Sequence, residues 1–337
     1  MKGMHKIGTA IAVAITIGNL ARPLPAAAPE WPAGETATPA HDGLSVMTFN
    51  VKGLPFPIAR GRPQALAAIG HRLAELRRAG HQPGVVVLQE AFTNDAKAIA
   101  RLAGYAHVAL GPQHGDVAPA SDRDAKGRTW YKGEGVGKWL DSGLVILSDY
   151  PIVRTRTMAF PDAMCAGFDC LAAKGVQVAW IAVPGKAAPV AIANTHLNSR
   201  KASGVSRARA DRMYRQQVST LRAFLNRTVA PRGDLILGGD FNIGGDPGRL
   251  AATHASGGYV GTGLEASEAA HCANCAPALR DDLAAIRERD KDKQFFRPAA
   301  DHGLMLDGIT VPFGARNGGN DLSDHLGYIA HYHFTAS

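Results

Sequence analysis

Six short apolar runs, rich in valine, isoleucine and leucine, recur along the chain. Runs this short favour buried strands over helices, and they occupy residues 44–49, 85–88, 143–147, 176–182, 189–193 and 235–237. Apolar residues at helical spacing lie between some of the runs, namely Leu66, Ile69, Leu73 and Leu76 and, later, Met213, Val218, Leu221 and Leu225. Because other runs follow one another with no room for a helix, the sequence predicts an α/β protein with mixed sheets.

The first 42 residues differ in composition from the rest of the chain. Two lysines precede an apolar stretch, and Pro-Ala-Ala-Ala closes residues 1–28, which predicts a secretory signal peptide. The apolar stretch is shorter than the ~20 residues that a membrane anchor needs. Residues 29–42 are expected to be a linker and residues 43–337 one globular domain. The protein is therefore expected to be secreted or periplasmic.

Four cysteines, Cys165, Cys170, Cys272 and Cys275, form two closely spaced pairs. In an exported protein we expect disulfides, and four cysteines allow three pairings. His271 beside Cys272 and Cys275 is also compatible with a zinc site, but a structural site needs a fourth ligand and the compartment is oxidising. Disulfides are the favoured interpretation.

Polar groups follow four of the apolar runs. Asn50 follows the first run, Gln89 and Glu90 the second, residues 194–196 the fifth and residues 240–242 the sixth. In layered α/β folds, ligands collect beyond strand ends, where loops rather than packing decide the residue types. Four such endings that share one edge predict a metal or phosphate site.

The sixth run continues as Gly-Gly-Asp-Phe-Asn. Side chains alternate along an extended chain, so Asp240 and Asn242 should point one way and Phe241 the other, into the core. The two glycines remove side chains where a backbone or a substrate comes close. The alternative interpretation is an Asx turn that caps a loop.

Oxygen ligands and an imidazole complete the candidate set. Glu90 and Asn50 offer the oxygens that Mg²⁺ prefers, although Glu90 alone is also typical of an acid at a helix N-terminus. Near the C-terminus Asp324 precedes His325. An imidazole can take a proton from water near neutral pH, and a nearby carboxylate can fix its tautomer or bind metal.

A formal net charge of +8 favours partners that carry phosphate, either a nucleic acid or a lipid headgroup layer. One basic run is either a nucleic-acid track or a solvated helix face: Arg200, Lys201, Arg207, Arg209, Arg212 and Arg215. An aromatic pair between two bases, Phe295 and Phe296, is either a membrane finger or part of the core.

Six ordered motifs resemble the endonuclease/exonuclease/phosphatase superfamily, the DNase I-like metal-dependent phosphoesterases. They are TFN at 48–50, QE at 89–90, SGLVILSDYPI at 142–152, NTHLNS at 194–199, GGDFN at 238–242 and SDH at 323–325. The resemblance implies a four-layer α/β/β/α sandwich, with two mixed β-sheets face to face and helices outside. Two further segments, FNVKGLPFP and MCAGFDCLAAKGV, resemble the bacterial neutral sphingomyelinases most.

The resemblance also implies roles at a metal and phosphate site. It makes Glu90 the principal ligand of Mg²⁺, or of Mn²⁺ or another divalent cation, with Asn50 in the metal and phosphate shell and Asp324 near the metal. Lys174 becomes a candidate phosphate contact, or simply a solvated residue at a strand start.

For the reaction itself, the resemblance makes His325 the general base and His196 the group that stabilises the transition state or assists the leaving group. Asp240 and Asn242 would position the attacking water and a phosphate oxygen, and Asp307 would orient a catalytic histidine.

Three functions follow from these observations. The first is an exported Mg²⁺-dependent phosphodiesterase that hydrolyses sphingomyelin to ceramide and phosphocholine at a phospholipid surface, with no obligate protein partner. The second is a secreted DNase I-like endonuclease. The third, a non-catalytic binding protein of the same fold, is disfavoured because the set of acids, amides and histidines is complete.

Overall fold

The apolar runs form strands of two six-stranded mixed sheets in the computed structural model, which describes residues 43–117, 128–255, 264–270, 275–297, 303–315 and 318–335. The predicted signal peptide and linker lie outside the described residues. Sheet 1 has the order β11-β12-β1-β2-β4-β3 and contains β1 (Gly43–Asn50), β2 (Val85–Gln89), β3 (His107–Leu110), β4 (Val145–Ser148), β11 (Leu304–Thr310) and β12 (Tyr328–Phe334).

Sheet 2 has the order β5-β6-β7-β8-β10-β9. It contains β5 (Ile152–Ala159), β6 (Gly175–Ile181), β7 (Val190–His196), β8 (Leu235–Asp240), β9 (Leu264–Glu265) and β10 (Asp292–Arg297). Strands β1 and β2 are parallel, as are β7 and β8, and the other neighbouring strands are antiparallel. Both sheets are therefore mixed, as predicted.

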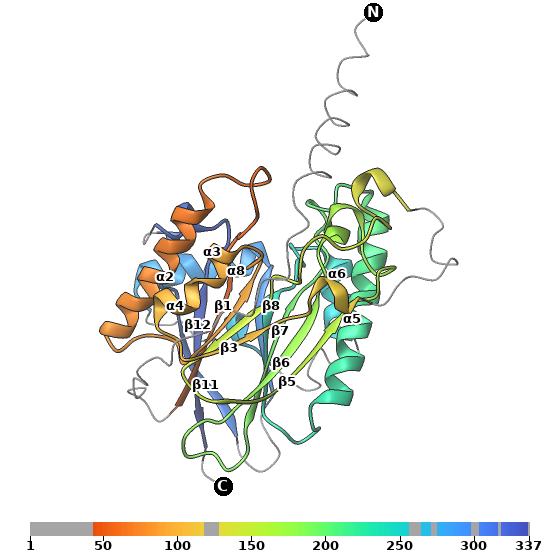
Figure 1. Cartoon of the computed structure of the whole chain (residues 1–337). Helices are drawn as coiled ribbons and strands as arrows, with labels where there is room; N and C mark the ends of the chain where they lie inside the picture. The colour runs from red at the N-terminus through yellow and green to blue at the C-terminus, as the bar shows by residue number, and fades with distance from the viewer. Residues whose placement is uncertain are drawn as a thin grey trace, which may run out of the picture. The chain divides into compact units, whose positions relative to one another are not determined.

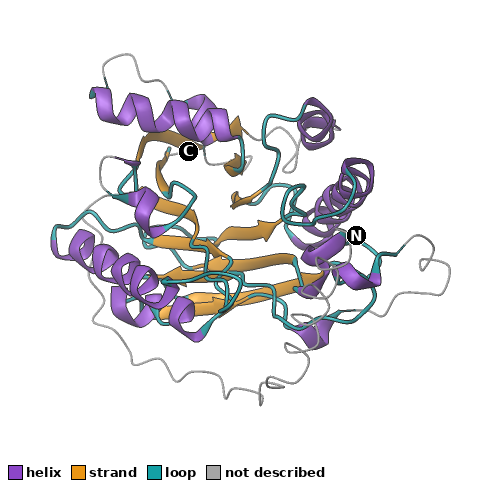
Figure 2. Cartoon of the chain, turned by 90° about the horizontal axis from the view of Figure 1, so that it is seen from above, coloured by secondary structure: helices purple, strands orange, loops and turns teal. Residues whose placement is uncertain are grey.

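Helices cover the outer sides of the two sheets (Figures 1 and 2). The helices are α2 (Arg62–Arg78), α3 (Asn94–Lys97), α4 (Ile99–Ala103), α5 (Arg207–Thr228), α6 (Pro247–His254), α7 (Ala266–Ala269), α8 (Pro277–Arg289) and α9 (Gly319–Leu322), with short 3₁₀ turns η1 (His114–Asp116), η3 (Trp130–Lys132) and η4 (Gly167–Leu171). Helices α2 and α4 lie outside sheet 1, and α5 and α6 lie outside sheet 2. The predicted four-layer sandwich is confirmed.

Two apolar layers hold this arrangement together. The inner layer joins the sheets and includes Val46 and Val87 of sheet 1 and Ile192 and Ile236 of sheet 2, all fully buried. The outer layer lies between sheet 2 and α5, whose buried residues recur at helical spacing as predicted. None of the helices in the described part of the chain is both long and apolar enough to cross a bilayer.

The aromatic pair in β10 belongs to these layers. Phe295 and Phe296 are 4% and 3% exposed, and the Phe295 ring meets Phe241 edge to face at 5.1 Å between centroids. Lys293 is buried and forms an ion pair with Asp290 at 2.9 Å. The pair is therefore part of the core, and the membrane-finger interpretation is wrong.

The three cysteines in the described residues form disulfides. Cys165 and Cys170 are bridged, and Cys275 is also disulfide-bonded, which removes it as a zinc thiolate. Cys272 lies outside the described residues. The bridge closes the η4 turn beside the start of β6, so it stabilises a loop near the sheet edge discussed below.

The two glycines of β8 lie where backbones and sheets come close. A Cβ at position 238 would stand 2.6 Å from Val87 Cγ2 of the facing sheet, and one at Gly239 would stand 2.3 Å from the carbonyl oxygen of Thr195. Because a backbone oxygen cannot move aside, Gly239→Ala is expected to destabilise the fold by about 1–3 kcal/mol. Urea unfolding measures this, and Gly308→Ala, where nothing lies within 4 Å, is the matched control. Equal stability of the two variants would contradict the close approach.

Candidate metal and phosphate site

One edge of the sandwich gathers the polar strand ends because parallel strands end, and antiparallel strands begin, at the same edge. Asp240, the last residue of β8, is paired on one side with His196, the last residue of β7, and on the other with Asp292, the first residue of β10. In sheet 1, Asn50 ends β1 beside Gln89 of β2. Since β1 packs against β8, the two sets face each other.

The Asn50 amide joins the two sheets at this edge. Its Nδ2 donates to Glu90 Oε1 and to Asp240 Oδ2, each at 3.0 Å. Asn50 and Asp240 are buried and Glu90 is half-buried. Two carboxylates therefore approach one amide in a region with little water, which is electrostatically unfavourable without a cation.

The carboxylate pKa values reflect this crowding. Burial raises the pKa of Glu90, the Asn50 amide opposes this change, and the charge of Asp240 adds to it. Although burial would also raise it, the pKa of Asp240 is lowered to about 2 by His325, His196 and the Asn50 amide. Asp240 therefore keeps its negative charge at neutral pH.

The donor set fits a hard divalent cation. Two groups of three residues each bring one potential ligand atom per residue within 4.8 Å of one another. The first group is Glu90, His196 and Asp240, and the second is Asp240, Asp292 and His325. Carboxylate oxygens dominate both groups, and Mg²⁺ and Mn²⁺ prefer oxygen ligands. The residues present can therefore hold such an ion around Glu90 and Asp240.

Two similar turns end β1 and β8. Asn50 Oδ1 accepts a hydrogen bond from the Lys52 amide, and Asp240 Oδ1 accepts one from the Asn242 amide, both at 3.0 Å. Lys52 and Asn242 have φ values of 50° and 49°. The Asx turn is thus present, but it uses only Asp240 Oδ1 and leaves Oδ2 facing the site. The two interpretations of residues 240–242, an Asx turn and one side of a metal or phosphate site, are therefore compatible.

Backbone strain is concentrated at the same edge. Among the described residues, four that are not glycine have positive φ, and three of them are Lys52, Asn242 and Glu90, the last with φ 56°. Such conformations are disfavoured for L-residues and cluster at functional sites. The Asn242 side chain is held by a hydrogen bond from its Nδ2 to the Leu197 carbonyl at 3.0 Å.

His325, which lies just before β12, forms a buried pair with Asp292, the first residue of β10. His325 Nδ1 lies 2.7 Å from Asp292 Oδ2 and 3.0 Å from Oδ1, while its Nε2 faces Asp240 Oδ2 at 3.8 Å. Although burial opposes it, Asp292 and Asp240 raise the pKa of His325 to about 9. Asp292 thus fixes the ring with Nε2 directed into the site.

His196, Lys174 and Asp169 form a second chain of contacts. Lys174 Nζ lies 3.1 Å from His196 Nε2 and 3.0 Å from Asp169 Oδ1. Burial and the charge of Lys174 lower the pKa of His196 to about 3, so this imidazole is neutral. Lys174 is only 6% exposed, so the interpretation of a solvated residue is wrong.

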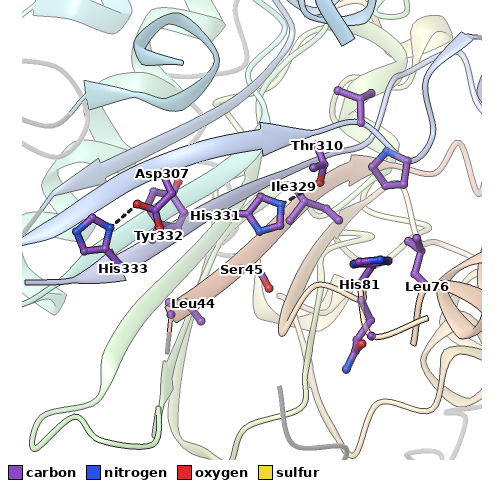
Figure 3. Close-up of a pocket in the computed structure, with 15 residues that line it drawn as sticks. Leu44, Ser45, Leu76, His81, Asp307, Thr310, Ile329, His331, Tyr332 and His333 are labelled. Carbon is purple, nitrogen blue, oxygen red and sulfur yellow. Dashed lines mark hydrogen bonds and ion pairs between the residues drawn. The ribbon is translucent and has the colours of Figure 1, made fainter. Parts of the chain in front are cut away.

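The expectation for Asp307 is also wrong. Asp307 is exposed on β11 and contacts Nδ1 of His333 in a pocket outside sheet 1, where Figure 3 shows the two side by side. His333 pairs with Gly43 at the start of β1, and Asn50 at its end lies roughly 23 Å away at 3.3 Å per residue. The carboxylate that holds His325 is that of Asp292.

Asp324 is separate from the clustered ligand atoms. Its side chain is 54% exposed and forms an ion pair with Lys52 Nζ at 3.5 Å. The structure therefore brings Asn50, Glu90, His196, Asp240 and His325 together but leaves Asp324 at the rim. Sequence reasoning missed Asp292 because it lies in the charged run Arg-Glu-Arg-Asp-Lys-Asp-Lys, and only its register opposite Asp240 distinguishes it.

The His325–Asp292 pair predicts a titration in the protein kept metal-free with EDTA. The pKa of His325, followed by NMR, is expected at about 9 rather than the ordinary 6.5, and Asp292→Asn should move it back toward 6.5. Because the folded-state pKa is raised, this pair stabilises the fold below pH 6.5 and the contribution is lost as the pH rises through 9. Asp307→Asn, the matched control, should leave the pKa of His325 unchanged. If the pKa of His325 stayed at about 9 in Asp292→Asn, the pairing would be disproved.

Two mixed sheets with acids, an amide and histidines at one edge define the class of this protein, the DNase I-like α/β sandwich. The chain belongs to the endonuclease/exonuclease/phosphatase family, whose model matches residues 47–325. No curated protein matches the sequence.

Solved structures share the fold at low sequence identity. Sphingomyelinase C from Streptomyces griseocarneus is 22% identical, with 86% of this chain and 99% of that chain covered and a TM-score of 0.54. Beta toxin from Staphylococcus aureus with bound magnesium ions is 17% identical, with 86% and 99% covered and a TM-score of 0.56. TDP2 from D. rerio with a single-strand DNA product is 15% identical, with 88% and 100% covered and a TM-score of 0.54.

Proposed function

We propose that this protein is a divalent-metal-dependent phosphodiesterase that hydrolyses a phospholipid headgroup ester, with sphingomyelin as substrate and ceramide and phosphocholine as products. The observation that carries the proposal is Asp240, whose carboxylate lies between the Asn50 amide and the two histidines. Sphingomyelinase C and a magnesium-bound beta toxin among the structures of this fold support the substrate class and the metal.

The proposed chemistry divides among the residues of the site. Glu90 and Asn50, with Asp240, would hold the cation, and the chemistry supplied by a bound Mg²⁺ is neutralisation of charge on the phosphoryl oxygens. In the metal-free protein a pKa of about 9 keeps His325 protonated at neutral pH. A cation held by Asp240 would offset the negative charge that helps to raise this pKa, so that His325 would take a proton from water at Nε2, since Asp292 occupies Nδ1.

Negative charge also develops on the phosphoryl group during the reaction. Lys174, held beside His196, is placed to stabilise it. Asn242 would contact a phosphate oxygen. In-line attack by water would form a new P–O bond while the P–O bond to the ceramide oxygen breaks, without a covalent enzyme intermediate. His196 would stabilise the transition state or assist the departing oxygen, which takes up a proton from the solvent.

Two substrates decide between the first two functions. Purified protein with Mg²⁺ is expected to release phosphocholine from sphingomyelin vesicles and to leave supercoiled plasmid intact. Plasmid nicking without lipid turnover would overturn the lipid substrate and favour the nuclease.

Paired arginines weigh against the nuclease. Arg200 binds Asp211 at 2.9 Å and Asp246 at 2.8 Å, and Arg209 binds Glu134 at 2.8 Å. A side chain already paired with an acid gains less from a nucleic-acid phosphate, because that contact must be exchanged. Only part of the basic run therefore remains to follow a nucleic-acid backbone, with Arg212 and Arg215 exposed on α5.

Export is the final part of the proposal. The sequence of residues 1–28 has the pattern of a cleavable signal, and disulfides such as Cys165–Cys170 persist in oxidising compartments. Detection of the mature protein, lacking residues 1–28, outside the cytoplasm would support this assignment, and a full-length cytoplasmic protein would refute it.

A further inference from the structure

Exposed apolar side chains gather in two segments beside the site. Of eleven large hydrophobic residues that are exposed in the described part of the chain, seven lie in the 51–61 loop or within residues 130–139 and 167–171. Phe56 and Ile58 are 76% and 62% exposed, and Trp130 and Tyr131 are 72% and 66% exposed. Clusters of this kind mark interaction surfaces in soluble proteins.

The 51–61 loop lies on the sheet 1 side of the site. It follows Asn50 directly, and Arg62 at its end donates hydrogen bonds to the carbonyls of Val51 at 2.8 Å and Leu322 at 2.6 Å. Leu322 belongs to the segment that carries His325. The loop is therefore fixed beside the edge of the sandwich that carries the candidate site, which we call the catalytic edge. In Figure 1 it rises in orange above the end of β1.

The second segment, which we name the η3–η4 ridge (residues 130–139 and 167–171), lies on the sheet 2 side. Its two parts are joined by hydrogen bonds from the Gly167 amide to Glu134 and from the Trp139 amide to the Leu171 carbonyl, each at 2.8 Å.

Within the ridge, Phe168 is 50% exposed and directly precedes Asp169, the partner of Lys174. Because Lys174 also contacts His196, the ridge is connected to His196 through Asp169 and Lys174. In Figure 1, η3 stands in yellow at the same end of the sandwich as the 51–61 loop.

Basic side chains accompany the exposed rings. Arg60 in the loop is exposed, as is Lys201, whose neighbour Ser203 accepts a hydrogen bond from the Phe168 amide at 3.0 Å. Tryptophan and tyrosine have apolar rings with one polar group and favour the headgroup region of bilayers, while lysine and arginine are attracted to anionic headgroups.

We propose that the 51–61 loop and the η3–η4 ridge dock together on the surface of a lipid bilayer, with the catalytic edge between them facing the headgroups. This inference deepens the proposed function and rests on it. It assigns the contact to two loops beside the site, in place of the buried Phe295–Phe296 pair.

The position of the two segments favours a bilayer over a protein partner. They flank the catalytic edge, so a surface that touches both covers the site. A protein bound there would block the substrate, whereas a bilayer presents the substrate in its own surface. Nucleic acid also carries its phosphodiester with it, but the exposed groups here are chiefly apolar, and nonspecific nucleic-acid binding depends on many phosphate contacts.

Vesicle co-flotation tests the proposal. The full protein is mixed with phosphatidylcholine vesicles, with and without phosphatidylserine, and compared with Phe56→Ser/Ile58→Ser and with Trp130→Ser/Tyr131→Ser. Each double variant is expected to bind vesicles about tenfold or more weakly, because two large apolar side chains leave the lipid. Phosphatidylserine should strengthen binding of the parent protein.

A control variant removes other exposed apolar groups that lie outside the two segments. Val153 on β5 and Met305 on β11 are 57% and 50% exposed, and Val153→Ser/Met305→Ser should bind vesicles like the parent. All variants should retain hydrolysis of a soluble phosphodiester, which shows that they fold. Equal loss in the control, absent binding by the parent, or loss of single-stranded DNA binding with vesicle binding unchanged would overturn the docking surface.

The vesicles contain no sphingomyelin, so docking and catalysis are read separately. Loop-dependent vesicle binding by a protein that does not hydrolyse sphingomyelin would refute the proposed substrate and support the surface. Sphingomyelin turnover that is unchanged in both double variants would refute the surface and leave the proposed function standing.

Discussion

His325→Ala is expected to lower kcat for a soluble chromogenic phosphodiester by about 10²–10⁴-fold, the usual contribution of a general base. Asp292→Asn should lower kcat by a similar factor, since an amide at Nδ1 can select the wrong imidazole tautomer. The equivalent Asp→Asn change in a Ser-His-Asp catalytic triad lowers kcat by about 10⁴-fold. In the structure, Asp292 lies 2.7 Å from His325 Nδ1. The two losses should not add in the double variant, because the residues act as a unit.

The protein contains its own control for this experiment. His333 and Asp307 form another imidazole–carboxylate pair, exposed on the outside of sheet 1. His333→Ala and Asp307→Asn should therefore leave kcat unchanged. Full activity of His325→Ala would eliminate the proposed general base, and a large loss in Asp307→Asn would reinstate the residue that the sequence motif favoured.

Glu90→Gln is expected to weaken Mg²⁺ binding by at least about 100-fold, beyond the 10- to 100-fold effects of residues that only support a ligand. The amide keeps the shape of the side chain but removes the charge. Calorimetric titration of EDTA-treated protein measures the affinity directly. Activity should disappear in EDTA and return with Mg²⁺ in the parent protein, which would also exclude a non-catalytic binding protein.

The same variant should stabilise the metal-free fold. Burial raises the pKa of Glu90 and Asp240 adds to this effect, so the ionised carboxylate is disfavoured in the folded protein, increasingly so as the pH rises above 4.5. Glu90→Gln should therefore have a higher Tm than the parent in EDTA but a smaller gain in Tm on adding Mg²⁺. The exposed residue Glu75 on α2 provides the control, Glu75→Gln. Unchanged Mg²⁺ affinity in Glu90→Gln would place the metal elsewhere.

Local patterns were sufficient where burial and strand direction fix the outcome. The apolar runs indicated strands because short, valine-rich segments bury both faces, and the ends of these strands located Asn50, Glu90, His196 and Asp240. Strands with exposed or alternating side chains were not recognised. For example, β5 (Ile152–Ala159) has a largely exposed pattern that lacks the continuous apolar signal of the central strands.

The sequence by itself determined six of the strands and the polar groups that follow four of them, because these properties depend on neighbouring residues. Only the tertiary structure decided that Asp292 rather than Asp307 holds His325, since this depends on the register of β10 against β8. It also decided that Phe295 is buried and Phe56 exposed. Both are aromatic residues next to polar or proline neighbours, and exposure is set by which distant segments pack over them.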